Sequence, residues 1–135
     1  MKKLFSTKYS AGSVNAAMFI LRVGVGLLLL NHGYQKLTHF ASTVKIMPPL
    51  PFFTGEMKAA LIIFSEFFCS IFVILGLVTR LACIPILIGF GIILFKVHHL
   101  DFFNTGQLAS LFTLAFIAIL LIGPGKGSID GMRGK

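Results

Sequence analysis

Two charged residues lie inside long apolar runs, and they are the first candidates for chemistry. Arg22 lies in the apolar run at residues 14–34, and Glu66 lies in a second run at residues 57–78. Charges within membrane-length apolar segments are costly, so they mark a functional group or a buried pair. At 1.5 Å per residue, Arg22 lies about 12 Å and Glu66 about 18 Å from the same side. An arginine side chain can close that gap. We therefore predict a buried Arg22–Glu66 pair that serves as a structural clip or as a ligand or proton site.

A second set of polar residues flanks the opposite ends of the runs. At about 100° per residue, Lys36 shares a helix face with Arg22, and His32 lies just beside that face. We expect His32 to hydrogen-bond a ligand headgroup and Lys36 to lie toward the mouth of the same site. The secondary candidates at this mouth are Lys96, His98, Asp101 and Gln107. Neighbouring histidines point apart and no second carboxylate lies close by, so we predict no metal site.

The elements that must position these residues follow from composition. Of 135 residues, 56% are hydrophobic and 12% are charged, whereas soluble domains are about 45–50% apolar and about 25% charged. A chain this short could not bury so many apolar side chains in water. The net charge of +8 comes mainly from residues at the termini and at the ends of apolar runs. That distribution favours contact with lipid headgroups and argues against nucleic-acid binding.

The apolar runs predict an all-α integral membrane protein with four spans, at about residues 14–34, 57–78, 81–97 and 107–123. The four spans form one domain over residues 14–123, between a polar N-terminal segment at 1–13 and a tail at 124–135. The tight Thr79-Arg80 connection predicts an antiparallel hairpin and an up-down-up-down four-helix bundle. The proline-containing connection at residues 35–56 is expected to follow an extended path along the interface. Lys and Arg are more numerous on the side of the termini, which predicts that both termini are cytoplasmic.

This ordered set of features resembles the DoxX family of small four-helix membrane proteins, over about residues 16–131. The matching stretches are Leu21-Arg22, Gly33-Tyr34-Gln35-Lys36-Leu37, Glu66, Leu75-Gly76-Leu77-Val78-Thr79-Arg80-Leu81 and Gly123-Pro124-Gly125-Lys126-Gly127-Ser128-Ile129-Asp130. The resemblance implies a bacterial cytoplasmic (inner) membrane protein of a kind that is sometimes associated with oxidoreductases. Related DoxD proteins resemble the membrane subunit of a thiosulfate:quinone oxidoreductase. The polar positions that match are Arg22, Lys36 and Glu66, whereas many relatives have an acidic residue near Gln107.

These observations lead to three functional hypotheses. In the first, the chain is a small subunit that supports a membrane oxidoreductase by binding a quinone-like or other amphipathic molecule. Arg22 and Glu66 would form the floor of that site. The sequence shows no flavin motif, cysteine pair or haem ligands. We therefore expect a quinone as the one possible cofactor, and we do not expect the protein to act as an enzyme on its own. The second hypothesis is a non-catalytic structural or assembly partner of a membrane complex. The possible protein partners are membrane or soluble oxidoreductase subunits and further copies of the chain. The third is a small proton-coupled transporter with Glu66 as its proton site.

Overall fold

The computed structural model describes residues 2–97, 99–101 and 103–134, and within these ranges every regular element is a helix. A long first helix, α1, is followed by a short one, α2, and then by a continuous helix made of α3, the π-helical turn η2 and α4. Next come α5 with its π-helical extension η3, and then α6; the elements η1 and α7 are short terminal helices. The bounds are η1 Lys2–Phe5, α1 Ala11–Thr38, α2 Phe40–Ile46, α3 Gly55–Ile63, η2 Phe64–Phe68, α4 Cys69–Leu75, α5 Thr79–Ile92, η3 Ile93–Val97, α6 Gln107–Ile122 and α7 Ile129–Met132.

Within the described residues, three helices are long and apolar enough to cross a membrane: Ala11–Thr38, Gly55–Leu75 and Thr79–Val97. The fourth apolar helix, α6, has 16 residues. At 1.5 Å per residue it is about 24 Å long, which is shorter than a typical hydrocarbon core of about 30 Å. The predicted all-helical protein with membrane-length helices is therefore confirmed, and α6 is the short member of the set.

The helix ends follow from local sequence. The Ser10 and Thr54 hydroxyl oxygens each accept a hydrogen bond from the backbone N–H three residues further on, which caps the starts of α1 and α3. The ends of α4 and α6 are glycines in backbone conformations that other residues rarely adopt, with φ of 71° at Gly76 and 96° at Gly123. These caps fix where each helix stops and the chain turns.

The connection between α1 and α3 differs from the expected extended path over residues 35–56. Here α1 continues to Thr38 and α2 follows almost directly, so the irregular part is confined to residues 47–54. The Thr43 hydroxyl donates to the carbonyl oxygens of His39, at 3.0 Å, and Lys36, at 3.2 Å, which holds α2 against the end of α1. The prolines exclude helix only in their own neighbourhood, at residues 48–51, because proline lacks a backbone N–H.

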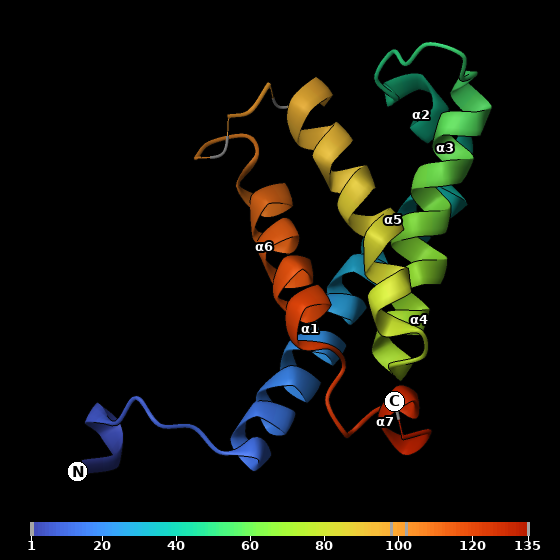
Figure 1. Ribbon diagram of the computed structural model, residues 1–135. Coiled ribbons are helices and arrows are strands. Elements are labelled where there is room, and N and C mark those ends of the chain that lie inside the picture. The colour runs from blue at the N-terminus through green and yellow to red at the C-terminus, as the bar shows by residue number, and fades with distance from the viewer. Residues whose placement is uncertain (1, 98, 102, 135) are drawn as a thin grey trace.

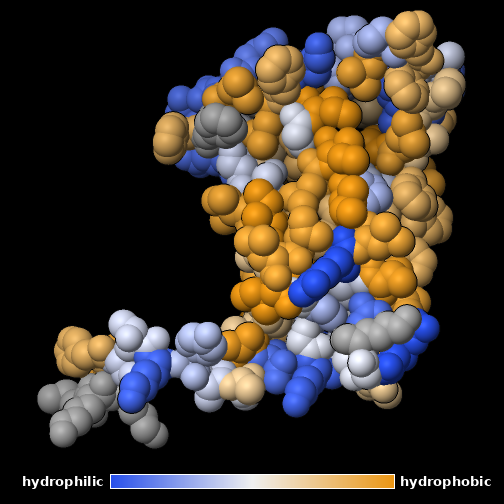
Figure 2. Space-filling view, viewed as in Figure 1, coloured by the Kyte–Doolittle hydropathy of each residue, from blue (hydrophilic) through white to orange (hydrophobic). Residues whose placement is uncertain are grey.

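The helices pack against one another around an apolar core, and Figure 1 shows how they are arranged. α1 lies along η2 and α4, and α5 lies along α6. The innermost apolar side chains are Leu29, Val73, Cys83, Ile86, Phe116 and Ile119. Figure 2 shows a broad hydrophobic outer surface over the middle of the molecule and hydrophilic residues toward its two ends. This surface suits lipid contact, because a soluble monomer rarely exposes so large an apolar area.

The two ends of the molecule carry different elements. In Figure 1, η1, α7 and the turn between α4 and α5 lie at the lower end, which we call the terminal end. α2 and the irregular segment 47–54 lie at the upper end, which we call the loop end. A polar site occurs at each end, and the two sites use different residues.

Candidate functional site

Glu66 lies in the π-helical turn η2, and its side chain is only 5% exposed. Its carboxylate forms an ion pair with the Lys36 ammonium group near the end of α1. The Ser70 hydroxyl donates a hydrogen bond to the Glu66 backbone carbonyl, one turn further along the helix. π-Helical turns are rare and occur often at functional sites. The turn therefore places a buried carboxylate where a cation from the neighbouring helix can reach it.

Gly33 allows this ion pair because it brings the two helices into backbone contact. A Cβ atom at Gly33 would lie 2.6 Å from the backbone nitrogen of Phe67 and 2.8 Å from the carbonyl oxygen of Glu66. Only glycine fits at such a distance, and small residues are the usual means by which membrane helices approach closely. Lys36 lies three residues later on the same face of α1. The glycine thus sets the distance that the lysine side chain spans.

Arg22 is almost completely buried, with 1% of its surface exposed, but it does not contact Glu66. Its guanidinium group donates to the carbonyl oxygens of Val73 at 2.9 Å, Ile74, and Gly127 at 2.6 Å. The predicted Arg22–Glu66 pair is therefore wrong. The carbonyls at the C-terminal end of α4 carry partial negative charge and lie within hydrogen-bond distance of the guanidinium group, so they hold Arg22 together with the Gly127 carbonyl.

Asp130 is the important polar residue that sequence reasoning missed. Its carboxylate accepts hydrogen bonds from the backbone N–H groups of Val78 and Thr79, both at 2.9 Å, and from the Thr79 hydroxyl at 3.0 Å. Its own backbone N–H donates to the carbonyl oxygen of Gly76 at 2.8 Å. Burial by itself raises the pKa of Asp130. These hydrogen bonds and the nearby Arg133 lower the pKa by more than burial raises it, so the pKa lies below its ordinary value. The signal in the sequence is the polar segment 126–130, which follows a Gly-Pro-Gly stop.

His32 is half-buried and packs against an aromatic side chain. Its ring meets the Phe112 ring edge-on, with 5.8 Å between the ring centroids. This contact joins α1 to α6. Within the described residues His32 makes no side-chain hydrogen bond, so its role as a headgroup donor stays a prediction.

The secondary candidates at the predicted mouth bond locally instead of meeting one another. The Lys96 ammonium group lies over the Phe95 ring, 5.5 Å from its centroid. Asp101 accepts a hydrogen bond from the Asn104 side chain at 3.3 Å, and Gln107 donates to the Phe103 carbonyl. His98 lies outside the described residues. Among the residues described, no cluster of His, Cys, Asp and Glu could hold a metal ion.

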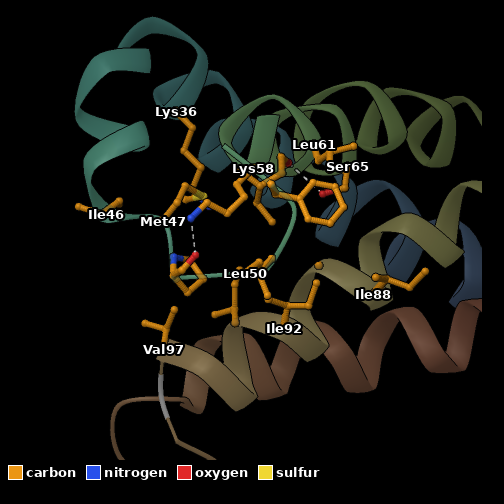
Figure 3. Close-up of a pocket in the computed structure, with 15 residues that line it drawn as sticks. Lys36, Ile46, Met47, Leu50, Lys58, Leu61, Ser65, Ile88, Ile92 and Val97 are labelled. Atoms are coloured by element: carbon orange, nitrogen blue, oxygen red, sulfur yellow. Dashed lines mark hydrogen bonds between the residues drawn. The ribbon is translucent and has the colours of Figure 1, made fainter. Parts of the chain in front are cut away.

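A cavity of about 430 Å³ lies at the loop end (Figure 3). It lies between α3 and α5, and residues 46–53 close it on one side. In Figure 3, Lys36, Met47 and Lys58 lie toward one end of the cavity, and Ile88 and Ile92 line it from α5. The remaining walls are mostly apolar: Ile46, Pro48, Leu50, Phe53, Leu61, Ile62, Gly89, Ile93 and Val97.

The polar groups of this cavity are few and partly occupied. The Lys58 ammonium group donates to the Pro48 carbonyl at 2.7 Å, and the Ser65 hydroxyl donates to the Ile62 carbonyl at 2.9 Å. An ammonium group has three N–H donors, so Lys58 keeps two for a ligand. An apolar cavity of several hundred Å³ with a few polar side chains is typical of small-molecule sites. Of the four main candidates from the sequence, which are Arg22, His32, Lys36 and Glu66, the described lining of the cavity contains only Lys36. Glu66 is in contact with Lys36 through the ion pair.

The DoxX family model matches residues 17–99, which is more than half of the chain. The chain belongs to the DoxX family. The predicted family is thereby confirmed, and this DoxX protein is a multi-pass membrane protein in contact with the lipid bilayer. The matched range contains the Lys36–Glu66 pair, Arg22 and every residue that lines the loop-end cavity. Searches of curated proteins and of solved structures found no match.

Proposed function

We propose that this DoxX protein binds a quinone-like amphipathic molecule in the loop-end cavity and so acts as a small subunit that supports a membrane oxidoreductase. The observation that carries the proposal is the cavity itself, with about 430 Å³ of space, apolar walls and two lysines on one side. A quinone has a flat ring with two carbonyl acceptors and an apolar tail. The ring oxygens would meet the lysines, and the tail would lie against the isoleucines of α5.

The charges around the cavity favour a neutral ring with strong acceptor oxygens. Glu66 neutralises Lys36, so this lysine can donate a hydrogen bond without adding a net charge. Lys58 is held at the cavity wall by the Pro48 carbonyl, which leaves two donors to orient the ring. A bound quinone would carry electrons for a partner oxidoreductase. The residues of this chain would bind and orient the ring and exclude water from it.

We also propose that α6 is a fourth span, so that the helices form an up-down-up-down bundle with both termini in the cytoplasm. The support is that α6 is apolar and packs along α5, and that η1 and α7 lie at the same end (Figure 1). Cysteines introduced at Lys45 and Lys126, in a background with Cys69→Ala and Cys83→Ala, test the orientation. With a membrane-impermeant thiol reagent added to intact cells, the Lys45 position should react and the Lys126 position should not.

A matched pair of substitutions on α5 tests the ligand site. Ile88 lines the cavity and is 59% exposed, whereas Ile84, one turn earlier, is 45% exposed and lies outside the cavity. Both sites leave room for a larger side chain, so Ile88→Trp should fill the cavity while Ile84→Trp should not. Each protein is purified in mild detergent, and its bound lipids and quinones are extracted and measured by mass spectrometry. We expect about one quinone per chain in the wild type and in Ile84→Trp, and a clear loss in Ile88→Trp.

The same preparations distinguish the other hypotheses. Wild-type protein without bound quinone, together with a co-purifying membrane subunit that Ile88→Trp removes, would contradict ligand binding and favour an assembly role. Lys58→Met keeps the apolar stem but removes the donors, and Lys45→Met is its exposed control outside the cavity. Quinone that stays bound in Lys58→Met at wild-type affinity would refute the proposed ring contact. Proton-coupled flux in liposomes would favour the transporter.

A further inference from the structure

A second cavity, of about 740 Å³, lies at the terminal end between the start of α5, the end of α6 and the C-terminal segment. We propose that it binds the phosphate headgroup of an anionic phospholipid. Its basic side chains are Arg80, Lys126 and Arg133. This site is at the opposite end from the loop-end cavity, and the inference does not depend on quinone binding.

The charges at this cavity favour an anion. Among the described residues Asp130 is the one acidic residue in the lining, and both of its carboxylate oxygens already accept hydrogen bonds at the start of α5. Behind the lining, the buried Arg22 guanidinium donates to the carbonyl of Gly127, the residue next to Lys126. The region therefore contains one carboxylate and four positive charges, those of the three basic lining residues and Arg22. A bound phosphate would offset part of this excess positive charge.

Several cationic donors remain available to a ligand. The backbone N–H of Lys126 donates to the Asn15 side chain at 3.1 Å, which fixes the position of this residue in the cavity wall. In the part of the chain that the structure describes, the side chains of Lys126 and Arg133 form no hydrogen bond and no ion pair. Arg80 uses one nitrogen, for the Ile122 carbonyl at 3.2 Å. Arginine binds phosphate well because its planar donors match two phosphate oxygens.

The apolar part of the wall indicates that the phosphate belongs to a lipid. Val78, Leu81 and Ile122 line the same cavity, and each is strongly exposed in the described structure. Figure 2 shows hydrophilic side chains gathered at the lower end, directly below the hydrophobic outer surface. A phospholipid needs both surfaces, since its phosphate meets the cations while its glycerol and first acyl carbons meet the apolar side chains. A free phosphate ion would use only the cations.

Native mass spectrometry of the full chain in mixed micelles of phosphatidylglycerol and phosphatidylcholine tests this site. We expect the wild type to retain phosphatidylglycerol selectively. Lys126→Gln with Arg133→Gln should weaken that binding by roughly fivefold for each charge removed, or about 25-fold in total. Lys8→Gln with Lys45→Gln removes the same charge from exposed positions outside the cavity and should change binding less than twofold. Equal melting temperatures in the two double variants would show that the fold is intact.

Two further measurements identify the source of the phosphate. Leu81→Asn keeps every positive charge but removes an exposed apolar contact, so it should weaken phosphatidylglycerol binding several-fold. Inorganic phosphate added in millimolar excess should not displace the lipid. Equal retention of both lipids by the wild type, or an equal loss in the two double variants, would overturn the proposal. Displacement by inorganic phosphate would overturn the assignment to a lipid.

Discussion

Replacing Arg22 with methionine should destabilise the fold strongly, because this guanidinium ties α1 to the end of α4 and to the C-terminal segment. It donates three hydrogen bonds, to the carbonyls of Val73, Ile74 and Gly127. A hydrogen bond to a charged group contributes about 1.5–3 kcal/mol. Burying the charge offsets part of this sum, and among the described residues the Arg22 Nε atom has no partner. We therefore expect a net loss of about 2–4 kcal/mol in the free energy of unfolding.

The two buried cysteines provide the assay, because the chain contains no tryptophan. Cys69 and Cys83 are 3% and 0% exposed, so a thiol-reactive fluorophore should label them only when the helices separate. With a shift of about 3–6 °C for each kcal/mol in a chain of this size, Arg22→Met should melt about 10 °C lower. Arg80→Met is the control, since Arg80 is exposed and makes one hydrogen bond, at 3.2 Å. Its melting temperature should fall by a few degrees at most.

Double-mutant cycles decide between the observed contacts of Arg22 and a pair with Glu66. Val73 lies seven residues beyond Glu66, about 10 Å along the helix, so Arg22→Met and Glu66→Gln should add to within about 0.5 kcal/mol. Lys36→Met and Glu66→Gln should instead be strongly non-additive, because these two side chains form the ion pair. An unchanged melting temperature in Arg22→Met, or strong coupling between Arg22 and Glu66, would refute the reasoning.

Two further predictions concern the same contacts and use the same labelling assay. Gly33→Ala should cost about 1–3 kcal/mol, because its Cβ would lie 2.6 Å from the Phe67 backbone nitrogen. Gly24→Ala, on the same helix with nothing within 4 Å, should be neutral or stabilising, and equal effects at both glycines would contradict the close contact. Asp130→Ala should cost about 1–2 kcal/mol at pH 7, because it removes the cap of α5. The pKa of Asp130 is lowered in the fold, so its carboxylate stabilises the protein above about pH 4, its unfolded pKa. The difference between wild type and Asp130→Ala should therefore shrink as the pH falls below about 4, and a difference that is constant with pH would argue against this role.

The sequence predicted which polar positions are buried better than it predicted their partners. Arg22 and Glu66 are both buried, as expected for charges within apolar runs. Their distances from the same side of the membrane agreed with an ion pair between them. Distance along a helix, however, does not decide which acceptor lies closest to the guanidinium group. Carbonyls at the end of α4 and the Gly127 carbonyl accept the hydrogen bonds of Arg22. Lys36 reaches Glu66 because Gly33 brings the two helices together.

The loop-end cavity could not be predicted from sequence periodicity. The π-helical turn at residues 64–68 inserts an extra residue into the helix, which rotates the later residues relative to a regular helical wheel. The wall at residues 46–53 depends on where α2 ends and how the irregular segment returns to α3. The role of Asp130 depends on its contacts with Val78 and Thr79, which lie 52 and 51 residues earlier in the chain. Such contacts leave no local pattern in the sequence.

Labelling with a photoreactive quinone analogue tests the central claim most directly, because it reports where the molecule binds. The protein in mild detergent is irradiated with increasing analogue, digested, and mapped by mass spectrometry. We predict saturable labelling within the segments 46–65 and 88–97, which contain most of the residues that line the loop-end cavity. Unlabelled quinone should compete, and the labelling should be lost in Ile88→Trp but not in Ile84→Trp. Labelling that does not saturate, or that falls equally on the lipid-exposed residues of α6, would contradict the account.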